Sequence, residues 1–152
     1  MDEVTAFLAA VNPHYRTFFV VAFFTGLRLG EQVALKWKNV DWERKKISIV
    51  ESRVMGFEGS PKTKGSMRDV DILPVVEQVL RYQKRGGRVR SPYVFLNTEG
   101  NPIEGETLRK WTWAIALERA GIEYRSMYHT RHTYEKASCQ VNKLYHLTLW
   151  GP

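Results

Sequence analysis

The stretch TFFVVAFFTGLR, residues 17–28, places an arginine directly after a run of apolar side chains. Seven of the eight residues at 17–24 are apolar, so a helix formed here is apolar on nearly every face. Such a helix is buried on all sides, which predicts the central helix of the fold over about residues 14–25. Gly26 is a good end for it, because glycine adopts the left-handed conformation of a helix C-terminus without strain. Arg28 is therefore expected at the edge of the core.

The segments on both sides predict an α+β fold, mainly a helical bundle with a small antiparallel β-sheet. Residues 2–11 indicate a short helix, and Asn12 and Pro13 are suited to cap and begin the central helix. Alternating apolar residues predict strands at 46–50 and 68–74. Further helices are expected at 29–37, 74–85 and 107–120, and a short strand at 93–96.

Apolar spacing also predicts the buried side of the last of these helices. Leu108, Trp111 and Ile115 stand at i, i+3 and i+7, which is typical of one face of an α-helix. We therefore expect these three side chains to face the core. Between the two predicted strands, the glycine-containing segment 55–66 is expected to be a loop.

The overall charge favours a polyanionic partner. The chain of 152 residues carries a formal net charge of +7 and is long enough for one domain with a real core. Basic clusters gain free energy when they bind phosphates and release counterions. A basic surface without such a partner explains the charge equally well, so the charge alone does not decide.

The sequence also points to a compartment. Cys139 is the only cysteine, so there is no disulfide framework and no multi-cysteine zinc site, and a reducing compartment fits. The N-terminus begins with acidic residues, unlike a secretory signal. Residues 17–24 are too short to span a bilayer, which needs about 20 apolar residues. We therefore predict a cytoplasmic protein that does not interact with membranes.

Arg28 and Arg131, the latter between two histidines in YHTRHTY (128–134), suggest a pocket for an anion. Cleavage of a phosphodiester without a metal ion needs cations to neutralise the charge on the non-bridging oxygens. Guanidinium groups suit this role, because they are planar and permanently charged donors. The sequence shows no dense acidic cluster for magnesium, so no metal site is predicted. Each arginine could instead be structural, with Arg28 satisfying carbonyls at a helix end.

Three segments carry a more specific pattern, namely TGLRLGEQVALKWKNVDWERKKISI from Thr25, PKTKGSMRDVDILP from Pro61 and YHTRHTY from Tyr128. In this order they resemble the core motifs of the tyrosine recombinase (phage integrase) family. That family has a Thr-Gly-x-Arg motif, a lysine in a β-hairpin, and a His-x-x-Arg motif followed by His-Thr-aromatic. The resemblance covers residues 1–134 and implies the catalytic domain of a phage or mobile-element integrase.

The resemblance implies roles for particular residues. Arg28, followed three residues later by the acidic Glu31, and Arg131 would bind the phosphate, and Lys62, with Lys64 as the alternative, would be the general acid. The implied catalytic residues are Arg28, Lys62, Tyr128, Arg131 and His132. The implied DNA-backbone contacts, from the 60–68 turn and the 84–90 loop, are Lys64, Arg68, Lys84, Arg85 and Arg88. The family reaction is a transesterification on duplex DNA through a 3′-phosphotyrosyl intermediate, without cofactor, metal or ATP, by protomers that assemble on the DNA.

Tyr128 stands where the family motif has its first histidine. A phenol can donate a hydrogen bond to phosphate, but with a pKa near 10 such a group does not shuttle protons readily at neutral pH. We interpret Tyr128 as a variant of the motif. His129 or His132 could take part of the histidine's role. The alternative, which we favour, is that His129 faces solvent and His132 braces the start of its helix.

The segment after Arg131 also departs from the family. Tyr134 occupies the aromatic position of the third motif, which is usually a packing position, and Tyr145 comes early and lacks a preceding Gly-His step. We therefore predict a partial catalytic domain at 1–134 and an atypical tail at 135–152. The expected function is a recombinase domain that lacks its nucleophile. The alternatives are a non-catalytic DNA-binding remnant of an integrase and a basic helical module that binds RNA or protein.

Overall fold

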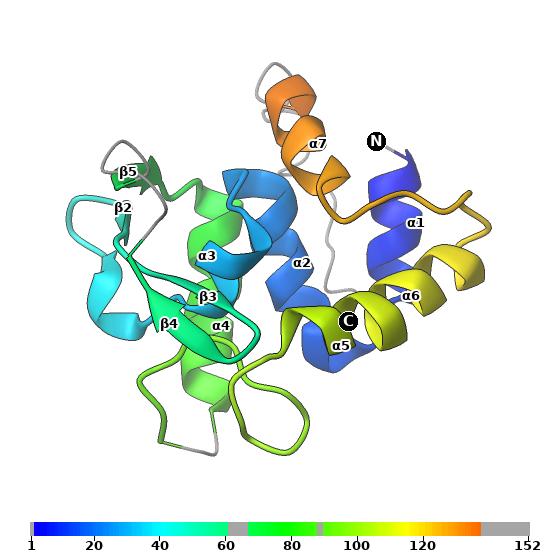
Figure 1. Ribbon diagram of the computed structural model, residues 1–152. Helices are drawn as coiled ribbons and strands as arrows, with labels where there is room; N and C mark the ends of the chain where they lie inside the picture. Colours follow the sequence, from blue (N-terminus) through cyan, green and yellow to red (C-terminus); the bar gives the residue numbers. More distant parts are fainter. Residues whose placement is uncertain (1, 61–66, 88–89, 138–152) are drawn as a thin grey trace.

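The computed structural model describes residues 2–60, 67–87 and 90–137 of the chain (Figure 1). The helices are α1 (Asp2–Ala10), α2 (Pro13–Thr25), α3 (Leu29–Val33), α4 (Pro74–Gly86), α5 (Gly105–Leu108), α6 (Ala114–Arg119) and α7 (His129–Ala137), with a short 3₁₀ turn η1 (Trp37–Asn39) and a π-helical turn η3 (Arg109–Trp113). The strands are β1 (Val40–Asp41), β2 (Lys46–Ile49), β3 (Ser52–Val54), β4 (Phe57–Gly59) and β5 (Arg68–Asp71). This architecture confirms the predicted α+β fold, mainly helical with small antiparallel sheets.

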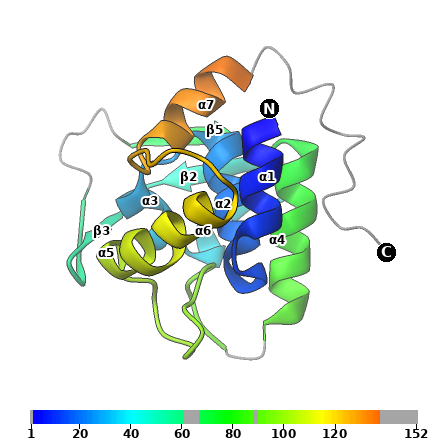
Figure 2. The ribbon, with the colours of Figure 1, turned by 90° about the vertical axis from the view of Figure 1, so that its right-hand side faces the viewer.

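Helix α2 is the central helix, as its composition predicts, and lies between α1 and α4 (Figures 1 and 2). All of its residues from Thr17 to Thr25 are buried. The side chain of Asn12 accepts a hydrogen bond from the His14 backbone N–H at 3.0 Å, and Pro13 is the first helical residue. Gly26 ends the helix in the left-handed conformation, with φ of 66°. None of the helices in the described part of the chain is both long and apolar enough to cross a bilayer.

A three-stranded antiparallel sheet in the order β1-β2-β5 covers one side of the bundle. Its β2–β5 pairing, with Lys46 opposite Asp71 and Ile49 opposite Arg68, joins the two strands predicted at 46–50 and 68–74. A β3–β4 hairpin between these two strands was not predicted, since β4 lies within the segment 55–66 that was expected to be a loop. Its two-residue tip has positive φ at both Met55 (52°) and Gly56 (80°), which is the conformation that lets a short turn join two twisted strands.

The prediction of a helix at 29–37 was wrong in its second half, because α3 ends at Val33. The backbone after α3 bonds instead to the segment at 92–94. Trp37 N–H donates to the Pro92 carbonyl and the Leu35 carbonyl accepts from Val94 N–H, both at 2.9 Å. The predicted strand at 93–96 makes isolated bridges, of Tyr93 to Lys36 and of Leu96 to Pro102. Tertiary pairing therefore replaces local helix formation at this point.

The predicted apolar stripe on the last helix was also wrong at Trp111, whose exposed fraction is 61%, and Ile115 is only half-buried and lies outside the core cluster. The turn η3 between α5 and α6 is π-helical, and a π turn accommodates more residues than an α turn. The buried side therefore passes from Leu108 to Trp113 and then to Ala116 and Leu117. Trp113 enters the aromatic core in place of Trp111.

Candidate active site

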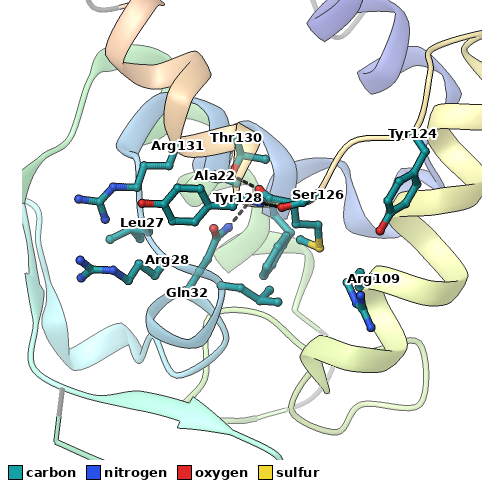
Figure 3. Close-up of a pocket in the computed structure, with 13 residues that line it drawn as sticks. Ala22, Leu27, Arg28, Gln32, Arg109, Tyr124, Ser126, Tyr128, Thr130 and Arg131 are labelled. Atoms are coloured by element: carbon teal, nitrogen blue, oxygen red, sulfur yellow. Dashed lines mark hydrogen bonds between the residues drawn. The ribbon is translucent and has the colours of Figure 1, made fainter. Parts of the chain in front are cut away.

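Arg28, Tyr128 and Arg131 line one cavity of about 300 Å³ between α3 and the start of α7. Figure 3 shows the two guanidinium groups and the Tyr128 hydroxyl pointing to the same side of this cavity. Its floor is largely apolar and is formed by Phe18, Ala22, Leu27 and Met127. The structure thus brings together the two arginines that stand in the first and third motifs.

Local structure places Arg28 at the mouth of the cavity. The left-handed Gly26 ends α2 and turns the chain, and Arg28 then becomes the N-cap residue of α3. Beneath it, the buried Gln32 side chain donates to the Phe18 carbonyl of α2. The start of α3 is therefore bound to the central helix, and this fixes where the Arg28 side chain leaves the backbone.

Local structure also fixes Arg131. The Ser126 hydroxyl accepts from Tyr128 N–H at 3.1 Å, and the Ser126 carbonyl accepts from His129 N–H at 3.0 Å, so these bonds form the turn that leads into α7. The buried Thr130 hydroxyl donates to the Met127 carbonyl at 2.9 Å. Arg131 follows in the first turn of α7, and its Nη1 atom is buried without a hydrogen-bond partner among the described residues. Buried donors are normally paired, so this atom is suited to bind an oxygen of an anionic ligand.

Glu31 forms an ion pair with Arg28. Its carboxylate is only 3% exposed and accepts from Arg28 Nη1 at 3.1 Å and from the Arg28 backbone N–H at 3.0 Å. Arg68 donates to the same carboxylate through Nη1 and Nη2, both at 3.0 Å. Burial by itself raises the pKa of Glu31, but the hydrogen bonds from Arg68 and Arg28 outweigh it and hold the pKa below its ordinary value.

The ionised Glu31 is expected to make the fold acid-sensitive. Because its pKa is lowered from 4.5, its stabilisation is present above that pH and is lost as the pH falls through the lower folded-state value. Glu31→Gln should lower the free energy of unfolding by about 1–3 kcal/mol at neutral pH, since it weakens hydrogen bonds to two charged groups. Melting curves recorded from neutral pH downwards measure this. Glu43→Gln, which alters an exposed carboxylate, is the control, and equal acid sensitivity of the two variants would contradict the assignment.

The histidines of the third motif lie beside Tyr128 on the rim. The His132 ring stands edge-on to the Tyr128 ring, with centroids 5.1 Å apart, and the His129 ring is 5.7 Å from that of His132. His129 is exposed, and its Nδ1 lies 3.1 Å from the Ser126 carbonyl oxygen. The contact between His132 and Tyr128 fits a supporting position for His132, and its catalytic role stays a prediction.

The other predicted residues divide into three groups. Lys62, Lys64, Arg88 and Tyr145 lie outside the described residues. Lys84 and Arg85 lie at the C-terminal end of α4, at the end of the molecule away from α7 (Figures 1 and 2), so the structure does not bring them to the cavity. Arg68 lies near the site through its ion pair with Glu31. The roles that the resemblance implies for these residues, catalytic for Lys62 and DNA-binding for the others apart from Tyr145, are not tested by these positions.

Two titratable side chains of the cavity were missed by the sequence analysis. Arg109 and Tyr124 lie on the opposite side of the cavity from Arg28 (Figure 3). The pKa of Arg109 is raised by its hydrogen bond to Glu106, with a smaller contribution from Tyr124. The Glu106–Arg109 spacing of three residues is typical of an ion pair on a helix, and it was the one local signal for Arg109. The π-helical turn that begins at Arg109 has no comparable sequence pattern. Within the described ranges, no cluster of three His, Cys, Asp or Glu side chains could hold a metal ion.

Tyr134 has a structural position. Its ring lies against Gly26, so closely that a Cβ atom added to Gly26 would be 2.7 Å from Tyr134 Cδ1. This contact joins α2 to α7, the helix that carries Arg131. It agrees with the packing role expected for the aromatic position of the third motif.

Comparison with known proteins places these features in a family. Residues 1–137 match the sequence profile described as "Phage integrase family". The chain is 32% identical over 160 residues to the tyrosine recombinase XerC-like protein of Caldanaerobacter subterraneus subsp. tengcongensis, with 88% of this chain and 41% of that protein covered. It is 28% identical over 156 residues to the prophage integrase IntR of Escherichia coli, with 87% and 38% covered. The chain thus spans about two fifths of the length of these curated relatives.

Solved structures share the fold. The crystal structure of XerA recombinase has a TM-score of 0.70 at 20% identity, over 92% of this chain and 48% of that one. A lambda integrase dimer bound to a core site has a TM-score of 0.64 at 16% identity, over 99% of this chain and 55% of that one. The profile match, the curated relatives and the shared fold agree, and the chain therefore belongs to the phage integrase family, with the fold of a tyrosine recombinase catalytic domain.

Proposed function

We propose that this domain binds duplex DNA and holds one backbone phosphate between the guanidinium groups of Arg28 and Arg131. The observation that carries the proposal is the buried, unpartnered Nη1 of Arg131, a residue that lines the same cavity as Arg28. A phosphate oxygen would satisfy this donor, and the second guanidinium would neutralise the remaining charge. The Tyr128 hydroxyl, on the same side of the cavity, would add a neutral hydrogen-bond donor (Figure 3).

The reaction for which such a phosphate site is suited is the metal-independent transesterification of the family. A tyrosine oxygen would attack the phosphorus and the bond from phosphorus to the 5′ oxygen would break, leaving a 3′-phosphotyrosyl intermediate. Arg28 and Arg131 would stabilise the charge that grows on the non-bridging oxygens. Lys62, or Lys64 as the alternative, would give its proton to the departing 5′ oxygen. Other protomers on the same DNA are expected partners.

DNA binding without strand cleavage is the second candidate function. Tyr134 favours it, because its ring packs against Gly26 and so serves to join α7 to α2. Tyr145 lacks the Gly-His step that precedes the nucleophile in the family. We therefore expect this chain by itself to bind DNA and not to form the covalent intermediate. A nicked substrate that releases the 5′ end tests this, because a tyrosine attack would leave a protein–DNA adduct on a denaturing gel.

Arg28→Ala and Arg131→Ala should each weaken binding to a short duplex by about tenfold, because each removes a charged hydrogen-bond donor from the phosphate. Each lost phosphate contact should also lower the slope of log K against log salt by about 0.9. Fluorescence anisotropy at several salt concentrations measures both quantities. Arg119→Ala, which removes an equal charge from the exposed end of α6, should have little effect. If all three variants bind equally well, or if the chain binds only RNA, the proposal fails.

A further inference from the structure

Arg68 forms a bidentate contact with Glu31, and the proposed reaction assigns this contact no role. Arg68 is the first residue of β5, and its Nη1 and Nη2 donate to Oε1 and Oε2 of Glu31, each at 3.0 Å. The same carboxylate accepts from Arg28 Nη1 at 3.1 Å and from the Arg28 backbone N–H at 3.0 Å. The sheet strand and the phosphate-binding arginine therefore meet on one carboxylate.

The three side chains of this contact differ in how far they are buried. The Glu31 side chain is 3% exposed, whereas the side chains of Arg68 and Arg28 are 30% and 49% exposed. A half-exposed arginine has many rotamers, and ordering it when the phosphate binds costs conformational entropy. Glu31 reduces that cost by holding the Arg28 guanidinium before the ligand arrives, and Arg68 in turn fixes the plane of the Glu31 carboxylate.

We infer that Arg68 is a positioning residue, which acts on the DNA phosphate through Glu31 and Arg28 and makes no direct contact with DNA. This inference rests on the proposed phosphate binding by Arg28. It replaces the role that the sequence resemblance implied for Arg68, which was contact with the DNA backbone.

The chemistry of the side chain makes the inference specific to arginine. A guanidinium presents two parallel N–H donors to the two oxygens of a carboxylate, whereas a lysine ammonium is a point charge. Arg68→Lys keeps the charge near Glu31 but loses the two-pronged geometry. A residue that merely attracts DNA by its charge would tolerate this change, and a positioning residue would not.

A double-mutant cycle tests the inference. Arg68→Gln should weaken binding to a random-sequence duplex by about fivefold in the otherwise unchanged chain, and Arg68→Lys by a similar factor. In a chain that already carries Arg28→Ala, the same substitutions should change binding by less than about twofold, because the group through which they act is gone. Anisotropy titrations below the melting temperature of every variant supply the four dissociation constants.

Each outcome of the cycle has one meaning. Equal losses in both backgrounds would show that Arg68 touches DNA directly and would overturn the inference. If Arg28→Ala alone leaves binding unchanged, the proposed phosphate site fails, whatever Arg68 does. If Arg68→Gln proves unfolded, Arg68→Lys decides, since it keeps the charge beside the buried carboxylate, and full binding by a folded Arg68→Lys would overturn the inference.

A matched control separates positioning from a general loss of an ion pair. Arg81 also pairs with a glutamate, donating from Nη2 to Glu77 Oε1 at 2.8 Å on α4. Arg81→Gln removes the same charge and the same kind of contact, but not one that touches Arg28. It should lower duplex affinity by less than about twofold in both backgrounds, as expected for an exposed pair remote from the phosphate.

Discussion

Trp113→Ala is expected to lower the free energy of unfolding by about 3–5 kcal/mol, as the loss of a large buried aromatic does. The Trp113 ring is 3% exposed and lies 4.7 Å from Phe7 and 5.7 Å from Phe19, measured between ring centroids. Its Nε1 donates to the Arg125 carbonyl at 2.7 Å, so the substitution also leaves that acceptor unpaired. Denaturant unfolding followed by circular dichroism measures the change.

Trp111→Ala is the matched control, since it removes the same side chain two positions away. Trp111 is 61% exposed, with Lys110 Nζ 4.9 Å from its ring centroid, so we expect a change within about 0.5 kcal/mol. The pair tests the π-helical turn itself, because a regular α-helix would bury position 111. Equal losses from the two substitutions would show that the helix does not change phase at η3.

Gly26→Ala is expected to cost about 2–5 kcal/mol, the second large effect. A non-glycine residue in the left-handed conformation costs about 1–2 kcal/mol. The new Cβ would also lie 2.7 Å from Tyr134 Cδ1, and overpacking of this kind costs about 1–3 kcal/mol. We expect this contact to push the Tyr134 ring, and α7 with it, away from α2. Because α7 carries Arg131, the variant should also bind duplex DNA more weakly than its stability alone explains.

Gly121→Ala separates the two causes. Gly121 also has a positive φ, 69°, but nothing lies within 4 Å of a Cβ added there. It should therefore show the backbone cost alone, about 1–2 kcal/mol, and leave DNA binding unchanged. Thermal melts and anisotropy titrations of both variants provide the comparison. If Gly26→Ala is no worse than Gly121→Ala, the contact between Gly26 and Tyr134 does not hold α7 in place.

Several features of the fold followed from local sequence pattern. The all-apolar run before Gly26 predicted the buried α2, and Asn12 and Pro13 predicted its start, because capping chemistry acts over a few residues. Alternating residues predicted the strands β2 and β5, because the two faces of a strand alternate from one residue to the next. The sequence missed the end of α3 at Val33, because the backbone there bonds to a segment far along the chain.

The sequence by itself determined the family, the central helix and the identity of the two candidate phosphate-binding arginines, since each follows from a short segment of the chain. Only the tertiary structure decided that Arg28 and Arg131 share one cavity, that Arg68 is bound to Glu31, and that Trp113 replaces Trp111 in the core. These outcomes depend on which distant elements pack together and in what phase. No local pattern encodes them, because packing is settled by the whole set of buried surfaces at once.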